Sequence, residues 1–180
     1  MTVTPDTIAT ERLILRKPLI DDAGAILDAY ARDPEVTKYL TWRSDQTPVK
    51  VQEFLRRVLS GWEKGTSFAW TVTLKEGNQI IGMIDLRMET HANLGYVLAR
   101  QFWNRGYMTE AVTAVASWAL QQEEINRVWA VCDVENTASA RVLEKAGFAR
   151  EGTLERWMVL PNRGTEPRDC YCYGKVKNHA

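Results

Sequence analysis

Strict alternation of hydrophobic and polar residues predicts strands in several parts of the chain. In residues 11–16, Leu13 and Leu15 fall on one face, as in a half-buried strand. The run 128–134 is almost continuously apolar, so we expect a strand that is buried on both faces. The predicted strands are 11–16, 68–74, 79–88, 94–99, 128–134, 151–159 and 168–176.

Hydrophobic residues three and four positions apart predict helices between these strands. The firmest helix begins at Thr47-Pro48, a capping residue followed by a proline, and ends at Gly65. Its apolar stripe consists of Val51, Phe54, Leu55, Val58, Leu59 and Trp62.

Three further helices are predicted from their end signals. One begins at Asp21 or Asp22 and stops before Pro34, one begins near Arg105, and one is capped by Asn136. The order of elements indicates an α/β (α+β) fold with one central sheet. We expect a single domain over residues 9–177, with tails at 1–8 and 178–180.

Composition narrows the classes of function. The chain has 180 residues, and 23 basic side chains balance 23 acidic ones, which argues against a dedicated nucleic-acid binder. We see neither a secretory signal nor an apolar run that could cross a membrane. Three cysteines and two histidines leave little material for a metal site. We therefore expect a cytoplasmic protein with no metal, nucleic-acid or membrane partner.

The segment 94–114 carries the clearest chemistry, because a strand, a tight polar loop and a helix follow one another. Gly106 is expected in the first turn of the helix, and Arg100 and Arg105 add positive charge beside it. The first N–H groups of a helix lack internal partners and lie at the positive end of its dipole. This junction therefore predicts an anion site, although an ordinary strand-to-helix turn explains the same glycine.

Residues 101–106 (QFWNRG) resemble the acetyl-CoA loop of the GNAT superfamily of N-acetyltransferases, Q/R-x-x-G-x-G/A, with Asn104 in place of the first glycine. Asn tolerates positive φ better than most residues. Further segments are similar, in order, to the RimJ/RimL-type branch, which includes ribosomal-protein N-terminal acetyltransferases. They are TERLILR (10–16), GY (95–96), GYMTEA (106–111), NTAS (136–139) and GF (147–148).

This resemblance implies a mixed, mostly antiparallel sheet in which strand 94–99 splays away from strand 128–134. Acetyl-CoA is then the co-substrate, and its pantetheine arm lies in the gap against backbone groups of Val97 and Leu98. The pyrophosphate is then bound by backbone amides, those of Asn104, Arg105, Gly106, Tyr107, Met108 and Thr109. The resemblance also implies that Asn136 bonds the pantetheine arm. Ser139 then lies near the sulfur as a candidate acid, with Tyr173 as a rival.

The general base is less clear, because relatives with A-E-L-G-Y carry a glutamate where this chain has Asn93. The base glutamate of some ribosomal-protein enzymes falls near Met158 and has no carboxylate counterpart. Glu89, His91, Asp85 and Glu155 are candidate substitutes, each also readable as a surface group. Glu110 is expected to serve the helix start instead.

The apparent lack of a base favours an acceptor amine of low pKa. At neutral pH, deprotonation opposes reaction of an α-amine by about 1 kcal/mol and that of a lysine by about 4.6 kcal/mol. The tryptophans give a weaker indication of the acceptor cleft. Trp42, Trp70, Trp103 and Trp157 are candidates to border it, whereas Trp62, Trp118 and Trp129 are expected in the core.

Two classes of function remain open from the sequence. The first is an acetyl-CoA-dependent N-acetyltransferase acting on a protein or peptide N-terminus or on a small amine, with a homodimer as one option. The second is an acyl-CoA-binding sensor or interaction module without turnover, which Asn93 and Asn104 keep open. An O-acyltransferase, or an enzyme for a longer acyl chain, is a third reading.

Overall fold

The structure, a computed structural model, describes residues 4–88 and 91–177. Within them, eight strands form one sheet in the order β1-β2-β3-β4-β5-β6-β8-β7. Only β5 and β6 pair in parallel, so the sheet is mixed and mostly antiparallel, as predicted. The strands are β1 (Thr7–Ala9), β2 (Leu13–Arg16), β3 (Ser67–Leu74), β4 (Ile80–Met88), β5 (Ala92–Leu98), β6 (Arg127–Asp133), β7 (Ala149–Val159) and β8 (Pro167–Val176).

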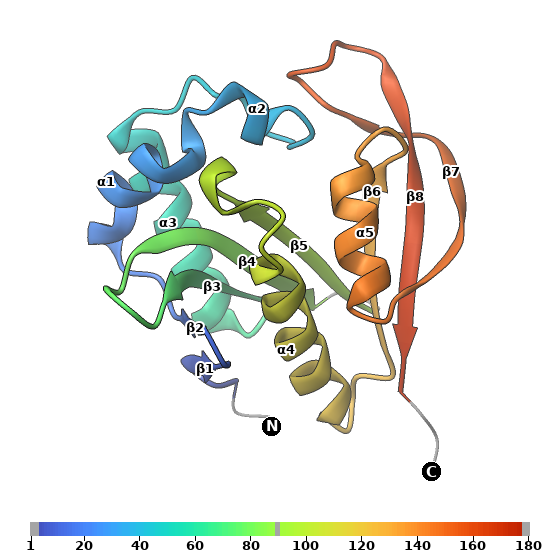
Figure 1. Cartoon of the computed structure of the whole chain (residues 1–180), viewed down its shortest axis with the longest axis horizontal. Coiled ribbons are helices and arrows are strands. Elements are labelled where there is room, and N and C mark those ends of the chain that lie inside the picture. Colours follow the sequence, from blue (N-terminus) through green and yellow to red (C-terminus); the bar gives the residue numbers. More distant parts are fainter. Residues whose placement is uncertain (1–3, 89–90, 178–180) are drawn as a thin grey trace.

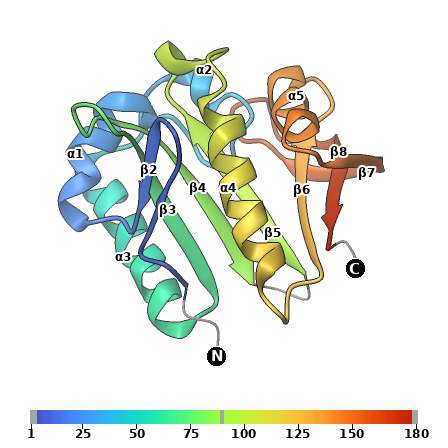
Figure 2. The same ribbon diagram turned by 60° about the horizontal axis from the view of Figure 1, so that its bottom comes forward.

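Helices cover both faces of this sheet (Figures 1 and 2). On one face α3 packs on β3 and α1 on β4, and on the other α4 crosses β2, β4, β5 and β6. The helices are η1 (Ile20–Asp22), α1 (Ala23–Ile26), η2 (Leu27–Ala31), α2 (Pro34–Thr37), α3 (Pro48–Lys64), η3 (Arg100–Phe102), α4 (Tyr107–Gln121) and α5 (Thr137–Lys145). In the described part of the chain, no helix has the length and apolarity needed to span a membrane.

The ends of α3 follow the sequence signals. Thr47 Oγ1 accepts a hydrogen bond from the Lys50 N–H at 3.3 Å, and Gly65 ends the helix at φ 67°. Glycine adopts this left-handed conformation without steric penalty. Of the predicted stripe, Leu55 and Trp62 are buried, whereas Phe54 is 38% exposed.

The helix predicted from Asp21 or Asp22 is less regular than expected. It is divided into η1, α1 and the π-helical turn η2, and it ends at Ala31, before Pro34 as predicted. Leu19, rather than Asp21 or Asp22, is the N-cap of η1, and the Asp22 carboxylate accepts a bond from the Leu19 N–H and two from Arg16, at 2.7 and 2.8 Å. A buried carboxylate needs such partners, and Arg16 on β2 supplies the charged one.

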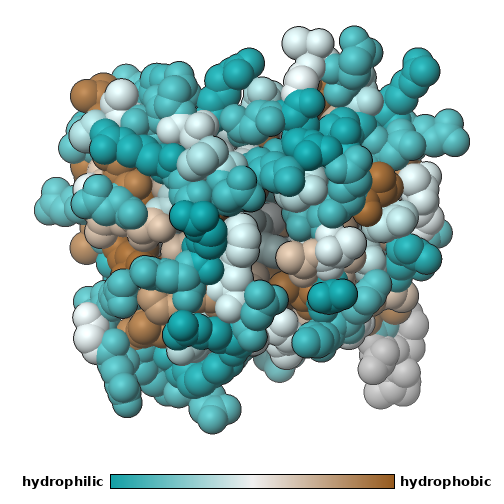
Figure 3. Space-filling view, turned by 45° about the horizontal axis from the view of Figure 1, so that its top comes forward, coloured by the Kyte–Doolittle hydropathy of each residue, from teal (hydrophilic) through white to brown (hydrophobic). Residues whose placement is uncertain are grey.

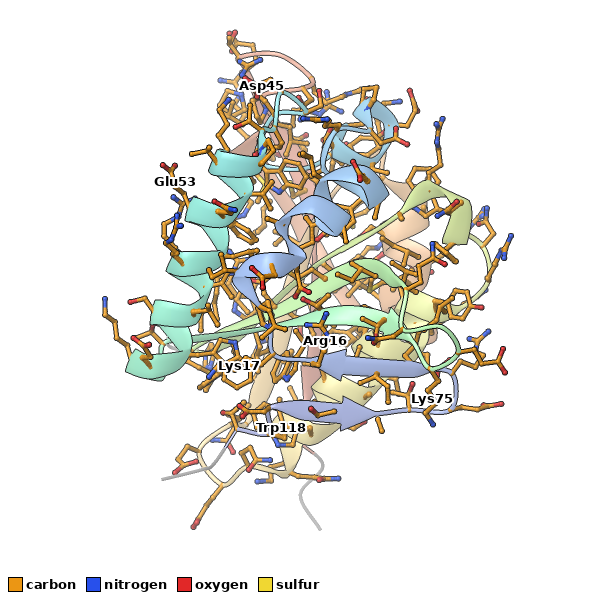
Figure 4. The ribbon with its side chains drawn as sticks, turned by 90° about the vertical axis from the view of Figure 1, so that its left-hand side faces the viewer. Arg16, Lys17, Asp45, Glu53, Lys75 and Trp118 are labelled. Carbon is orange, nitrogen blue, oxygen red and sulfur yellow. The ribbon has the colours of Figure 1, made fainter. Side chains whose placement is uncertain are left out.

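The predicted N-terminal tail, residues 1–8, is too long. Strand β1 pairs with β2, and the Pro5 carbonyl accepts a 3.0 Å bond from Trp70 Nε1. Trp70 is fully buried and packs edge-on against Trp62 and Trp118, so the expectation that it borders the acceptor cleft is wrong. Figure 4 shows Trp118 beside the β1–β2 hairpin, at one end of the molecule.

Strand β6 is buried on one face only, which corrects the prediction of burial on both. Val128, Ala130 and Cys132 are buried, whereas Trp129 and Val131 are partly exposed. The exposed face of β6 lies beyond α1 and α3, which cover β3 and β4. The sheet therefore has a partly open surface next to β5.

Candidate active site

The central feature of the site is the parting of two neighbouring strands. β5 and β6 pair only at Ala92–Val128 and Asn93–Trp129, near their N-terminal ends. β5 nevertheless pairs with β4 over its whole length, and β6 with β8, so both strands continue as they diverge (Figure 1). The splayed pair that the resemblance implied is therefore present.

Two helices begin at the open end of the splay, because α4 follows β5 and α5 follows β6 along the chain. Figure 3 brings this end forward and shows a recess near the middle of a largely hydrophilic surface. The first N–H groups of α4, which lack intrahelical partners, lie beside the diverging strands and suit a long ligand that carries anionic groups.

The loop before α4 has the backbone geometry of a tight anion-binding turn. Asn104 lies at φ 59° and Gly106 at φ 78°, both left-handed. Gly106 is the N-cap of α4 rather than a residue of its first turn, so the N–H groups of Tyr107, Met108 and Thr109 come next in order. Asn104, which replaces the family glycine, adopts the positive φ that asparagine tolerates. Arg105 is exposed beside them.

The start of α4 is tied to the N-terminal segment through Glu110. Its carboxylate accepts bonds from Thr10 Oγ1 at 2.6 Å, the Arg12 N–H at 2.8 Å and Arg12 Nε at 2.7 Å. Burial raises the pKa of Glu110, but these three bonds outweigh it and hold the pKa below its usual range. Arg12 also donates to the Arg105 carbonyl at 3.0 Å, so it braces the loop.

The end of β5 approaches β4 unusually closely. A Cβ on Gly82 would lie 2.3 Å from the Val97 carbonyl oxygen, so only glycine fits opposite this point. The next carbonyl, that of Leu98, accepts a 2.8 Å bond from Trp103 Nε1. Trp103 therefore supports the end of β5 on the loop side, rather than bordering a cleft on the far side of the splay.

The start of α5 places two polar side chains beside the splay, and one of them meets a tyrosine of β5. Asn136 caps the helix, since its Oδ1 accepts from the Ser139 N–H at 3.1 Å. The Ser139 hydroxyl lies 2.7 Å from the hydroxyl of Tyr96 on β5. The sequence reading did not assign Tyr96 a role, although its Gly-Tyr motif was part of the resemblance.

Cys132 of β6 lies beside Ser139 but is not an activated nucleophile. Burial raises the pKa of its thiol to about 12, although a hydrogen bond with Ser139 opposes that shift. Tyr173, the rival acid, is buried and donates to Glu144 Oε1 at 2.9 Å. Its proton is therefore already engaged on the α5 side.

Among the base candidates, Asp85 lies beside the splayed strand. It faces Gly95 across the β4–β5 ladder, and a Cβ on Gly95 would lie 2.6 Å from Asp85 Oδ1. Burial raises the pKa of Asp85, and the ion pair with Arg87 Nε at 2.8 Å only partly offsets this. A carboxylate with a raised pKa at a partly open position suits proton transfer.

The other base candidates are less well placed. His91 is exposed before β5, and Glu155 is exposed on β7, the outer strand of the sheet. Glu89 lies outside the described residues. Asn93 is buried on β5, opposite Arg87 of β4.

Two loops meet on the β6 and β8 side of the splay. Asn162, in the β7–β8 loop, donates to the carbonyls of Thr37 and Trp42, at 2.7 Å each. Trp42 is partly buried at this junction. Trp157 is 50% exposed on β7, where the pairing with β8 shifts register between Leu154 and Met158. Trp70, by contrast, lies in the core.

An ion-pair cluster that the sequence did not reveal fixes the loop between β6 and α5. The Asp133 carboxylate is fully buried and paired with Arg168 of β8, and Glu135 pairs with Arg168 and Arg163. Burial opposes ionisation of Asp133, yet Arg168 and the Glu135 N–H keep its pKa below its usual range. The cluster holds the segment that presents Asn136 and Ser139.

Comparison with known proteins agrees with this architecture. The acetyltransferase (GNAT) domain family matches residues 12–149, from β2 to the first residue of β7. The chain belongs to the GNAT acetyltransferase family. As a GNAT member it is an N-acetyltransferase, since its relatives carry that activity in their names. It is 31% identical over 162 residues to the uncharacterized N-acetyltransferase p20 of Bacillus licheniformis, covering 88% of this chain and 90% of that one.

This GNAT enzyme is also similar to two ribosomal-protein acetyltransferases, to one in sequence and to the other in fold. It is 26% identical over 161 residues to the ribosomal protein uS5-alanine N-acetyltransferase of Escherichia coli strain K12, covering 85% of this chain and 83% of that one. The fold also matches RimL, a ribosomal L7/L12 α-N-protein acetyltransferase solved with coenzyme A. There the TM-score is 0.85 at 19% identity, covering 94% of this chain and 97% of RimL.

Proposed function

We propose that this enzyme transfers the acetyl group of acetyl-CoA directly to a primary amine, at a protein or peptide N-terminus or on a small molecule. The observation that carries the proposal is the parting of β5 and β6 after two residue pairs, with α4 and α5 starting at the open end. Beyond Asn93 the backbone of β5 has no ladder pairing with β6, so its edge can pair with an extended chain that leads to the start of α4. The coenzyme A bound to RimL, which has the same fold, supports the assignment.

In this proposal the pyrophosphate of acetyl-CoA contacts the loop and first turn of α4. Backbone amides of residues 104–109 donate to it, and the exposed Arg105 adds positive charge. The pantetheine arm follows β5 along Val97 and Leu98 and reaches Asn136 at the start of α5. The thioester then lies near Ser139.

We assign the general base to Asp85. The amine nitrogen attacks the thioester carbonyl carbon, the C–N bond forms, the C–S bond breaks, and its electron pair stays on sulfur. The amine proton passes to Asp85, directly or through one water molecule. The position of Asp85 over Gly95 and its raised pKa support this role.

We propose an α-amine, or another amine of low pKa, as the acceptor. Even with a raised pKa, a carboxylate is a weak base for an ammonium as basic as that of lysine. The names of the two ribosomal-protein relatives, a uS5-alanine and an L7/L12 α-N-acetyltransferase, agree with this choice. Trp42 and Trp157 are the aromatic side chains that we assign to the edge of the acceptor site.

The test is release of the CoA thiol from acetyl-CoA in the presence of a panel of amines. The panel contains Ser- and Ala-starting peptides, the same peptides with blocked N-termini and one lysine, polyamines, aminoglycosides and amino-acid derivatives. We expect release with free α-amines and little with the blocked lysine peptides. Efficient acetylation of the blocked lysine peptides would contradict the α-amine assignment. Binding of acetyl-CoA without release by any amine would favour a binding module.

A further inference from the structure

The side chain of Tyr96 joins β5 to α5 across the splay. The Tyr96 hydroxyl lies 2.7 Å from Ser139 Oγ and also 3.1 Å from the Ser139 carbonyl oxygen. Tyr96 belongs to the part of β5 that has no pairing with β6. The bond therefore forms where the two halves of the sheet have separated.

The number of hydrogens limits what this pair can do. Each hydroxyl carries one hydrogen, and the Ser139 carbonyl carries none. If Tyr96 donates to Ser139 Oγ, the Ser139 hydrogen can point to a third atom, either the Cys132 sulfur or a bound ligand. If Tyr96 donates to the carbonyl instead, the Ser139 hydrogen is directed to the Tyr96 oxygen. Tyr96 therefore decides whether Ser139 has a hydrogen to offer elsewhere.

The Cys132 thiol and the Tyr173 hydroxyl beside the pair are uncharged at neutral pH, and the nearby Asp133 is held in an ion pair with Arg168. Cys132 of β6, Tyr173 of β8 and Glu144 of α5 face the two hydroxyls or their immediate neighbours, and Cys170, Asp133 and Arg150 act on the same cluster. The Tyr173 hydroxyl donates a hydrogen bond to the Glu144 carboxylate. A thiolate that forms beside Ser139 therefore depends on hydroxyl donors for stabilisation.

We propose that Tyr96 is a positioning residue that frees the Ser139 hydroxyl to donate a hydrogen bond to the departing CoA sulfur. This inference rests on the proposed function. As the C–S bond breaks, its electron pair goes to sulfur, Ser139 donates to that sulfur, and Tyr96 donates to Ser139. Neither hydroxyl loses its proton in this step, and the proton of the amine leaves by way of Asp85.

The chemistry of the two hydroxyls favours donation over proton transfer. Burial raises the pKa of Tyr96 well above its ordinary value, partly offset by its bond with Ser139, and an aliphatic hydroxyl is a still weaker acid. A thiolate, whose parent thiol has a pKa of about 8.5, does not remove a proton from either group. Ser139 is accordingly a hydrogen-bond donor to the leaving group and not a full acid.

The direct test uses CoA alone and needs no acceptor. The pKa of the bound CoA thiol is measured from the ultraviolet absorbance of its thiolate, with the wild type and the variants Tyr96→Phe and Ser139→Ala. We expect each variant to raise this pKa by about one unit, a tenfold loss of thiolate stability. The double variant should raise it no further than Ser139→Ala, because Tyr96 acts through Ser139.

Tyr39→Phe is the matched control, because the Tyr39 hydroxyl also bonds the β6–α5 segment. It donates to the Glu135 carbonyl at 3.4 Å, away from Ser139. We expect Tyr39→Phe to leave the thiol pKa unchanged, and Ser139→Thr, which keeps a hydroxyl, to restore most of the wild-type value. Equal thiol pKa values in the wild type and Tyr96→Phe would overturn the inference.

Turnover gives a second readout that separates positioning from folding. We expect Tyr96→Phe to lower kcat about tenfold, with the KM for acetyl-CoA little changed, since the bond to sulfur strengthens as charge develops. A loss of thermal stability with unchanged kcat would reduce Tyr96 to a structural tie and contradict the inference. Failure of the wild type to bind CoA at all would instead refute the proposed function, and the inference with it.

Discussion

Replacing Glu110 with glutamine tests how the anion-binding loop is held. Glu110 accepts three hydrogen bonds from Thr10 and Arg12, residues about a hundred positions away along the chain. In Glu110→Gln one oxygen remains an acceptor, but the new NH₂ group faces Arg12 Nε, which is itself a donor. The substitution therefore removes the ion pair and brings two hydrogen-bond donors, the new NH₂ group and Arg12 Nε, face to face without changing side-chain volume.

The expected loss follows from the exposure of the two partners. A hydrogen bond to a charged group contributes about 1.5–3 kcal/mol, and an exposed ion pair less than about 1 kcal/mol. The Glu110 side chain is 17% exposed and that of Arg12 is 42% exposed, so the pair lies between these cases. We expect Glu110→Gln to lower the free energy of unfolding by about 1–2 kcal/mol. For a chain of this length that corresponds to a fall in Tm of about 2–8 °C.

The pH dependence fixes the sign of the effect. The pKa of Glu110 is lowered by folding, so its contribution is fully present above its ordinary value of 4.5 and is lost as the pH falls through the lower folded value. Thermal unfolding of wild type and variant should therefore differ at neutral pH and converge in acid. Glu53→Gln, at an exposed position on α3 (Figure 4), is the control and should leave Tm unchanged. Equal Tm values for wild type and Glu110→Gln at neutral pH would refute the reasoning.

Three further variants test other parts of the site. Asp85→Asn should lower kcat more for acceptor amines of higher pKa, and it should remove the acidic limb of the pH profile of kcat/KM. An unchanged pH profile would exclude Asp85 as the base. Gly106→Ala should weaken CoA binding in calorimetry and lower the free energy of unfolding by about 1–2 kcal/mol, because alanine adopts φ 78° only at a steric penalty. A Gly106→Ala variant with the affinity and stability of the wild type would contradict this. Asp133→Asn should lower the free energy of unfolding in urea by about 3 kcal/mol, since it leaves the Arg168 guanidinium without its buried partner; a loss below about 1 kcal/mol would show that Glu135 compensates.

Local patterns predicted those parts of the fold that depend on neighbours in the sequence. The alternation in residues 68–74 and 79–88 corresponds closely to β3 and β4, and Gly65 and Asn136 mark helix ends as expected. These signals are reliable because an amphipathic period or a cap acts within one or two turns of chain. The irregular η1–α1–η2 segment was missed, because Asp22 is drawn to Arg16 and Thr71 on neighbouring strands.

The features of the candidate site also divide into those that follow from the local sequence and those that depend on packing between distant elements. The positive φ of Asn104 and the cap at Asn136 are local features, and each lies in a short motif that resembles the GNAT family. Trp70 was misplaced, because alternation gives the face of a strand but not what covers that face. The partners that bury it, Trp62 and Trp118, come from two different helices.

The sequence by itself determined that this chain forms one mixed sheet with helices, has a segment that resembles the GNAT acetyl-CoA loop, and has Asn93 where relatives carry a glutamate. Only the tertiary structure decided that Asp85 lies over Gly95 and that Tyr96 reaches Ser139, 43 residues away, across the parted strands. The physical reason is that strand register and the approach of distant side chains depend on how whole elements pack. No local period in the sequence encodes these distances.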